Sequence, residues 1–148
     1  MEINDILIRA FNANDMEAVL ALWESCGLIE PGHDPEIDIK RKMAHDPERF
    51  LVADAGGRVI GTCMAGYDGL RGWIYYLGVD PDFRKQGIAR RMLTHAALSL
   101  ERAGCPSINL MVKHRNRDVV SFYKKSGYEE DDVTVMSSPL HDRGSCPS

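Results

Sequence analysis

The chain has 148 residues, a formal net charge of −4 and a hydrophobic fraction of 44%. This length suits one domain with its own core, and this composition is typical of a soluble globular protein. The acidic balance argues against general nucleic-acid binding, and no apolar run approaches the ~20 residues of a membrane helix. Because the N-terminus lacks the basic and apolar segments of a signal peptide, we expect a cytoplasmic protein.

The cysteine and histidine pattern gives no indication of a metal site. The four cysteines form no C-x-x-C pair, and the five histidines show no ligand spacing. We therefore expect free thiols and no metal cofactor.

The first part of the chain predicts one strand and two helices. Apolar and polar residues alternate over 5–11, as in a strand. Asn14, with an acidic residue three positions later, has the pattern of a capping box, and apolar side chains recur at helical spacing up to Gly27. Asp34-Pro35 begins a second helix, which ends at Asp46-Pro47.

Three strands with short turns between them are predicted next. Residues 50–54, 58–67 and 73–79 are rich in β-branched and aromatic residues. Gly56-Gly57 and the segment 68–72 are turn signals. The three strands should therefore form an antiparallel meander.

The last part of the chain alternates helices and strands. We expect a long helix over 87–103 and then a strand over 107–112, parallel to the strand before that helix. Asn116 should cap a helix that reaches Lys125, a last strand should cover 128–136, and 137–148 should be a loose tail.

The resulting order, β-α-α-β-β-β-α-β-α-β, predicts an α/β fold with a mixed sheet and helices on both of its faces. The sequence contains no repeat, linker or internal boundary, so we expect a single domain over 1–148.

A basic loop follows the strand 73–79 and opens the long helix. It contains Arg84, Lys85, Arg90 and Arg91, with Gly87 between them. A helix N-terminus offers unpaired N–H groups and the positive end of the helix dipole, and glycine lets an anion approach the backbone. The loop matches neither G-x-G-x-x-G nor G-x-x-x-x-G-K-[ST]. A phosphate site and a plain helix start with solvated basic residues both explain this pattern.

Two segments resemble those of the GNAT superfamily of N-acetyltransferases. Leu77-Gly78-Val79-Asp80-Pro81-x-x-Arg84-x-x-Gly87-Ile88-Ala89 is similar to the segment whose Q/R-x-x-G-x-G/A loop holds the pyrophosphate of acetyl-coenzyme A. Asn116 and Phe122-Tyr123-x-x-x-Gly127-Tyr128 resemble the second segment of that family. The resemblance covers about residues 5 to 136, and the blocks around 66–69, 73–76 and 104–106 further resemble the bacterial YpeA-type branch.

This resemblance implies an acetyl-CoA-dependent transfer to a primary amine. It implies that the strand 73–79 and the next strand splay apart, and that the pantetheine arm pairs with the backbone between them; Gly78 suits a bulge that begins the splay. It places the pyrophosphate on the amides from Lys85 to Arg90. The implied coenzyme-binding residues are Leu77, Gly78, Val79, Arg84, Lys85, Gln86, Gly87, Ile88, Ala89, Arg90 and Asn116.

The resemblance also implies a catalytic acid. Tyr123 matches the family's tyrosine, whose phenol can donate a proton to the departing thiolate. A core aromatic beside Phe122 is the structural alternative, as an N-cap is for Asn116.

The general base is not indicated by the resemblance. Related N-terminal acetyltransferases have a glutamate where this chain has Met111, which cannot accept a proton. Asp68, Tyr75, Tyr76 and His114 are the substitutes that the sequence offers, and an amine that arrives neutral needs no strong base.

The acceptor stays open at this stage. The segment from Glu30 to Asp46 lies where the family builds its acceptor wall, and the acidic run 129–132 is either a solvated edge or an attractor for a cationic amine. A non-catalytic acyl-CoA-binding module and, more weakly, a nucleotide-binding protein are the alternative functions. Many domains of this family pair through their sheets, which leaves a homodimer open.

Overall fold

The computed structural model describes residues 5–140, and five strands form one sheet within them. The order of the strands in the sheet is their order in the chain. The first four strands pair antiparallel, and the fifth is parallel to the fourth, as predicted. The strands are β1 (Ile6–Ala10), β2 (Phe50–Ala55), β3 (Arg58–Tyr67), β4 (Gly72–Val79) and β5 (Ile108–Leu110).

The chain divides into two compact units, Met1–Met111 and Val112–Ser148. Within residues 5–140, the first unit contains the whole sheet and three α-helices, and the second contains one α-helix. The union of the two units in one acetyltransferase domain stays a prediction.

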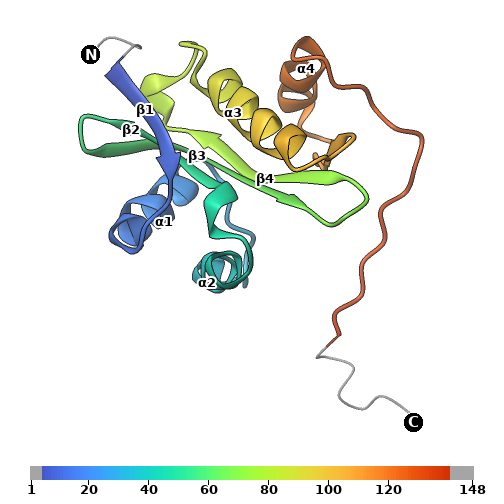
Figure 1. Cartoon of the computed structure of the whole chain (residues 1–148), viewed down its shortest axis with the longest axis horizontal. Helices are drawn as coiled ribbons and strands as arrows, with labels where there is room; N and C mark the ends of the chain where they lie inside the picture. The colour runs from blue at the N-terminus through green and yellow to red at the C-terminus, as the bar shows by residue number, and fades with distance from the viewer. Residues whose placement is uncertain (1–4, 141–148) are drawn as a thin grey trace. The chain divides into compact units, whose positions relative to one another are not determined.

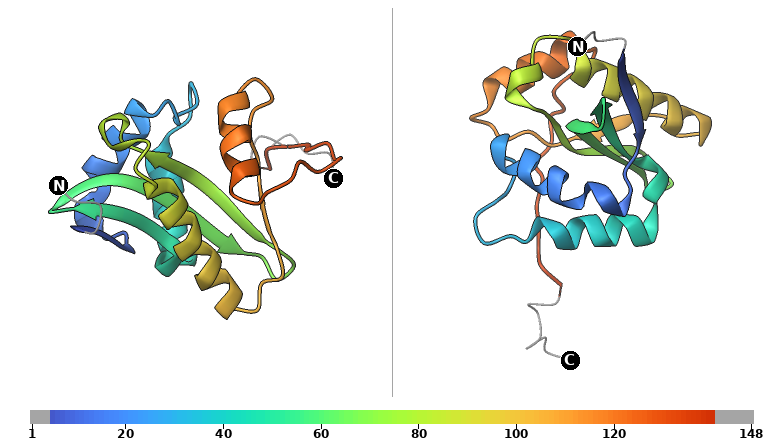
Figure 2. Two further views of the ribbon diagram at one scale, coloured as in Figure 1. Left: turned by 90° about the horizontal axis from the view of Figure 1, so that it is seen from above. Right: turned by 90° about the vertical axis from the view of Figure 1, so that its left-hand side faces the viewer.

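Helices cover both faces of the sheet in the first unit. Figure 1 and Figure 2 show α1 (Met16–Ser25) and α2 (Pro35–His45) on one face and α3 (Ile88–Arg102) on the other. Three short 3-10 turns complete this unit: η2 (Ala13–Asp15), η3 (Pro47–Arg49) and η4 (Pro81–Phe83). The fold class predicted from the sequence is thus confirmed.

The core beneath α1 and α2 is built around stacked aromatic rings. Phe50 of β2 stacks on Phe11 at 4.5 Å between ring centroids and lies 6.1 Å from Trp23 of α1. All three side chains are buried, because α1 presents its apolar stripe to the sheet. On the opposite face, Met92 and Leu100 of α3 are buried.

The tight turn between β2 and β3 has the predicted chemistry. Gly56 and Gly57 have φ angles of +61° and +97°. A two-residue hairpin with positive φ at both central positions accepts glycine most readily. This turn fixes the start of the meander.

The start of α1 differs from the prediction, because the capping box lies two residues earlier, on the turn η2 that leads into the helix, and Asp15, the N-cap of α1, makes no side-chain capping bond. The side chain of Asn12, not Asn14, accepts the cap hydrogen bond, which the Asn14 N–H donates at 2.9 Å. Asp15 accepts the reciprocal bond from the Asn12 N–H at 2.9 Å and pairs with Arg9 of β1 at 2.8 Å. The Arg9 guanidinium, which lowers the pKa of Asp15, holds this carboxylate at the strand and thereby sets the position of the box.

The second unit contains α4 (Arg117–Lys125), and the strand predicted over 128–136 is wrong. No strand follows α4 within the described residues, and the side chains of Val133, Val135 and Met136 are exposed. Glu130 pairs with Arg117 and Lys124 of α4 at 3.3 and 3.1 Å, so this segment makes its contacts to the helix. Of the predicted tail, only 137–140 lie within the described residues.

Candidate active site

The strands β4 and β5 are paired along only part of β4. Their ladder has three residue pairs, from Gly72–Ile108 to Ile74–Leu110. Beyond Ile74, β4 continues to Val79 with no strand on that side among residues 5–140. This is the predicted splay, and it leaves a strand edge whose backbone groups can pair with an extended ligand.

A bulge in β4 lies at the start of this unpaired edge. Thr62 pairs with Gly78 and Met64 with Tyr75, so Tyr76 and Leu77 together stand opposite Cys63. Tyr76 has a φ of +52°, which is unusual for a residue with a side chain. The bulge is therefore formed by Tyr76 and Leu77, and its predicted place at Gly78 was wrong.

A buried network holds the bulge in place. The Thr62 hydroxyl donates to the Tyr76 carbonyl at 2.8 Å and accepts from the Trp23 indole N–H at 2.8 Å. The Tyr76 ring stacks on Trp23 with centroids 3.8 Å apart, and its hydroxyl donates to Asp38 at 2.6 Å. These contacts from α1, α2 and β3 all hold Tyr76 in place. Several such contacts together can maintain a strained backbone conformation.

The substitution Thr62→Val tests this network. Valine keeps the branched shape but leaves the Trp23 N–H buried with no partner, so we expect the free energy of unfolding to fall by about 2 kcal/mol. Urea denaturation measures the loss. Thr94→Val is the control, because the exposed Thr94 hydroxyl bonds only to the Arg90 carbonyl within α3 and should change stability by less than about 0.5 kcal/mol. Equal losses in both variants would mean that the Thr62 hydroxyl does not hold the bulge.

A side chain at Gly78 would clash with the neighbouring segment that follows α1, and this close packing explains the glycine better than the bulge does. A Cβ at this position would lie 2.8 Å from Leu28 Cδ1 and 3.4 Å from the Cys26 sulfur. The segment after α1 thus packs directly on the backbone of β4. The Val79 carbonyl, a predicted coenzyme contact, accepts from Arg84 Nε at 3.1 Å and from the Cys26 thiol at 3.4 Å.

The basic loop turns between β4 and α3 through two residues of left-handed conformation. Lys85 has a φ of +65°, and Gly87, the N-cap of α3, has a φ of +78°. Such alternation directs successive N–H groups toward a common point and forms an anion-binding concavity. A Cβ at Gly87 would meet nothing within 4 Å, so the space before the helix is open.

The loop is anchored on the side of β4. Asp80 accepts from the Asp82 N–H at 2.9 Å and from Arg58 at 2.8 Å, and its own N–H donates to the Ile60 carbonyl at 2.7 Å. Arg58 also lies over the Phe83 ring, 5.2 Å from its centroid. These contacts fix the entry to α3 before any ligand binds.

The basic side chains near the loop have different surroundings. Arg84 donates to the Val79 carbonyl, whereas Arg91 donates to the Ile6 carbonyl of β1 at 3.0 Å and so ties α3 to the edge strand. Lys85 and Arg90 are exposed. Ile88 is buried, so only its backbone N–H can serve an anion, together with that of Ala89 in the first helical turn.

Three of the predicted residues, Asn116, Tyr123 and His114, lie in the second unit. Asn116 occupies the N-cap position of α4, but its side chain makes no capping hydrogen bond. Tyr123 is 8% exposed and packs edge-on against Phe122 and Tyr128. His114 is exposed. The roles of Asn116 and Tyr123 toward the coenzyme stay predictions, as do those of the loop and strand residues.

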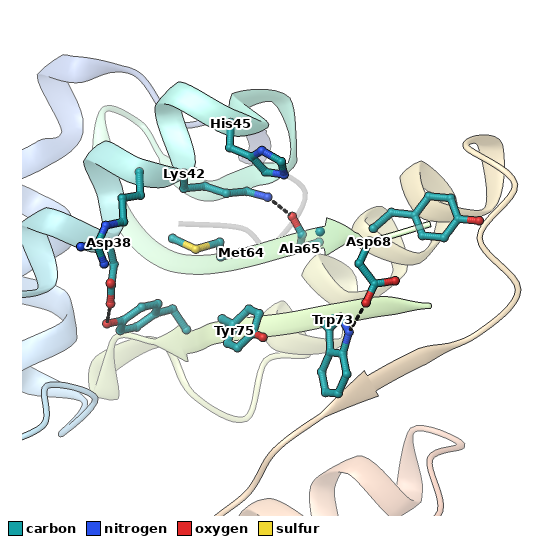
Figure 3. A pocket seen from close by; sticks show the side chains of 12 residues that line it. Asp38, Lys42, His45, Met64, Ala65, Asp68, Trp73 and Tyr75 are labelled. Carbon is teal, nitrogen blue, oxygen red and sulfur yellow. Dashed lines mark hydrogen bonds between the residues drawn. The ribbon is translucent and has the colours of Figure 1, made fainter. Parts of the chain in front are cut away.

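A cavity of about 460 Å³ lies between α2 and the strands β3 and β4 (Figure 3). The helix contributes Asp38, Arg41, Lys42 and His45, which share one face because they are spaced i, i+3, i+4 and i+7. The strand side is mostly apolar and aromatic and includes Met64, Tyr67, Trp73, Tyr75 and Tyr76. This helix lies within the segment Glu30 to Asp46, where the resemblance to the family places an acceptor wall. Arg41, Lys42 and His45 were not expected individually, although the sequence shows a charged helical stripe and aromatic strands.

The cavity contains three of the four candidate bases, and their surroundings make none of them an effective proton acceptor. The N–H groups of Arg71 and Leu70, with the Trp73 indole, hold the pKa of Asp68 below its usual range. Burial raises the pKa of Tyr75, and burial with the adjacent Asp38 raises the pKa of Tyr76 further. Asp68 therefore stays ionised and the two phenols stay protonated near neutral pH.

Comparisons with known proteins identify the family. The model of the acetyltransferase (GNAT) family matches residues 15–128. An acetyltransferase of Pectobacterium atrosepticum is 48% identical over 133 residues, covering 90% of this chain and 94% of the relative, and one of Sodalis glossinidius is 50% identical over 129 residues, covering 87% and 91%.

Solved structures agree in fold. Ard1 from Thermoplasma volcanium has a TM-score of 0.75 at 26% identity, with 83% and 82% of the two chains covered. The aminoglycoside N-acetyltransferase AAC(6')-Iy in complex with CoA has a TM-score of 0.74 at 20% identity, with 90% and 94% covered. The chain therefore belongs to the GNAT family of acetyltransferases.

Proposed function

We propose that the protein transfers the acetyl group of acetyl-CoA to a primary amine by direct attack of that amine. The observation that carries the proposal is the continuity of two features in the first unit. The unpaired edge of β4 leads directly into the anchored loop at the N-terminus of α3. The pantetheine arm of acetyl-CoA is extended and would suit the strand edge, and the diphosphate joined to it would suit the loop.

The coenzyme would be held mainly by backbone groups. Leu77 and Gly78 would pair with the pantetheine arm, and the amides from Lys85 to Arg90 would bind the pyrophosphate, with Gly87 giving access. That AAC(6')-Iy was crystallised with CoA supports this assignment through the shared family fold.

The chemistry requires three events. The neutral amine attacks the thioester carbon, a C–N bond forms, and negative charge develops on the carbonyl oxygen, which a backbone N–H of β4 would stabilise. The C–S bond then breaks, and Tyr123 would donate a proton to the departing thiolate. The proton lost by the amine passes to water, because Asp68 is a weak base and the phenols of Tyr75 and Tyr76 stay protonated.

The acceptor would occupy the cavity between α2 and the sheet. Tyr75 and Tyr76 belong both to that cavity and to the start of the unpaired edge of β4. An amine in the cavity therefore has access to a thioester held along that edge.

Calorimetry with acetyl-CoA and a screen of amines for release of coenzyme A test this function. We expect binding at micromolar concentrations and thiol release with at least one class of amine, with the acetylated product identified by mass spectrometry. No binding at millimolar acetyl-CoA would refute the proposal. Binding without thiol release across amines, peptides and proteins would instead identify a non-catalytic acyl-CoA-binding protein.

A further inference from the structure

The charged side chains of the cavity have hydrogen-bond or ion-pair partners within the chain, with one exception. Asp38 accepts from Tyr76 at 2.6 Å and lies 2.7 Å from the His33 ring nitrogen. Lys42 donates to the Ala65 carbonyl and lies 3.5 Å from Asp46. The exception is Arg41, which makes no ion pair or hydrogen bond with any residue of the described range 5–140.

The carboxylate at the far end of the cavity, that of Asp68, also has hydrogen-bond donors within the chain. Asp68 accepts from the N–H groups of Leu70 and Arg71 at 2.8 and 2.9 Å and from the Trp73 indole at 3.1 Å. Figure 3 shows Asp68 and Trp73 at the opposite end from Asp38, with Tyr75 between them. Each of these two carboxylates therefore has at least two hydrogen-bond contacts within the chain.

Arg41 is accompanied by His45, one turn further along the same face of α2. Both are exposed cavity-lining residues, and neither has a partner within the described chain. A guanidinium forms bidentate bonds with a planar carboxylate, and an imidazole adds one more donor. These two basic side chains, which have no partner within the described chain, are thus suited to bind an anion, and they lie beside an apolar strand surface.

The size of the cavity limits what this anion belongs to. About 460 Å³ accommodates a small molecule rather than a protein surface. Met64, Trp73 and Tyr75 offer apolar and aromatic surface to its body.

We infer that the acceptor is a small amine that carries a carboxylate, of the amino-acid type with an apolar side chain. Arg41 and His45 bind its carboxylate, the strand side of the cavity binds its side chain, and its amine lies toward Tyr75. This inference rests on the proposed function for the transfer step, but not for binding. Arg41 disfavours a polycationic acceptor at this end of the cavity, because it would repel one.

Matched pairs of amino acids and their carboxamides test the inference, for example L-leucine with L-leucinamide and L-methionine with L-methioninamide. The amine of a carboxamide is less basic, so the carboxylate-to-carboxamide ratio of kcat/KM is compared between wild type and Arg41→Gln, where that difference cancels. We expect the ratio to fall at least about 10-fold in the variant, through KM of the carboxylate substrate, because one charge-assisted contact is lost. Lys40→Gln is the control, because it removes the same charge from α2 outside the cavity, and it should leave the ratio unchanged.

Calorimetric binding of the same pairs in the presence of coenzyme A separates this inference from the proposed function. Carboxylate binding that Arg41→Gln weakens, without any thiol release, would uphold the inference and refute the transfer. Thiol release with an unchanged ratio, a preference for polyamines or aminoglycosides, or no binding of either partner would overturn the inference.

Discussion

Replacing Gly87 with valine should weaken the binding of acetyl-CoA about 100-fold or more. The side chain would project into the open space before α3, where the pyrophosphate is proposed to lie, and Gly87 has a φ of +78°. Displacing the diphosphate from two backbone N–H groups removes charge-assisted hydrogen bonds worth about 1.5–3 kcal/mol each. Calorimetry with acetyl-CoA measures the dissociation constant.

Gly104→Val separates crowding from backbone strain. Gly104 has a φ of +88° just after the other end of α3, and a Cβ there also meets nothing within 4 Å. Both variants should lose similar stability in urea, because the left-handed strain is the same. If the Gly104 variant weakens coenzyme binding as much as the Gly87 variant does, the effect is one of strain, and the loop is not the pyrophosphate site.

Replacing Tyr123 with phenylalanine should lower kcat about 100-fold while the dissociation constant of acetyl-CoA changes less than about twofold, because a general acid acts only as the thiolate departs. The ring itself stays, so the edge-on contacts with Phe122 and Tyr128 persist. Steady-state rates of thiol release and calorimetry give the two constants.

Tyr128→Phe is the matched control for this prediction. It removes a hydroxyl from the aromatic neighbour of Tyr123 in the same unit and should leave kcat within about twofold. A parallel decline of kcat and coenzyme affinity in Tyr123→Phe would show that Tyr123 is a packing residue.

The sheet was predictable because its signals are local. The glycines at 56 and 57 fix one hairpin, and the alternation of side chains in the strands gives their type. The parallel fifth strand follows from the helix before it. These features depend on neighbours in the chain, which the sequence displays directly.

The wrong predictions concern features whose position is set by contacts with residues of other elements. Asp15 forms its capping box at Asn12 because Arg9 holds it there. The bulge is at Tyr76 because Trp23, Thr62 and Asp38 converge on it from three other elements. The strand expected over 128–136 has the right composition, but a strand also needs a paired neighbour, which composition does not supply.

The coenzyme residues were predictable through motifs that occupy contiguous positions, whereas the acceptor side was predictable only as the segment Glu30 to Asp46 and a few candidate bases. The cavity draws its wall from α2 and its floor from β3 and β4, so only folding brings Arg41 near Tyr75. A cytoplasmic location and pairing of two chains through their sheets stay predictions.

The three-pair ladder between β4 and β5 also bears on the motions of the sheet. The strands β2, β3 and β4 are joined by short turns, whereas β5 reaches the sheet only after the whole of α3. Closing that longer loop costs more chain entropy and is repaid by few hydrogen bonds. Local opening at this edge therefore breaks few hydrogen bonds and leaves the meander folded, so the strand beside the proposed thioester site is a part of the sheet that can separate on its own.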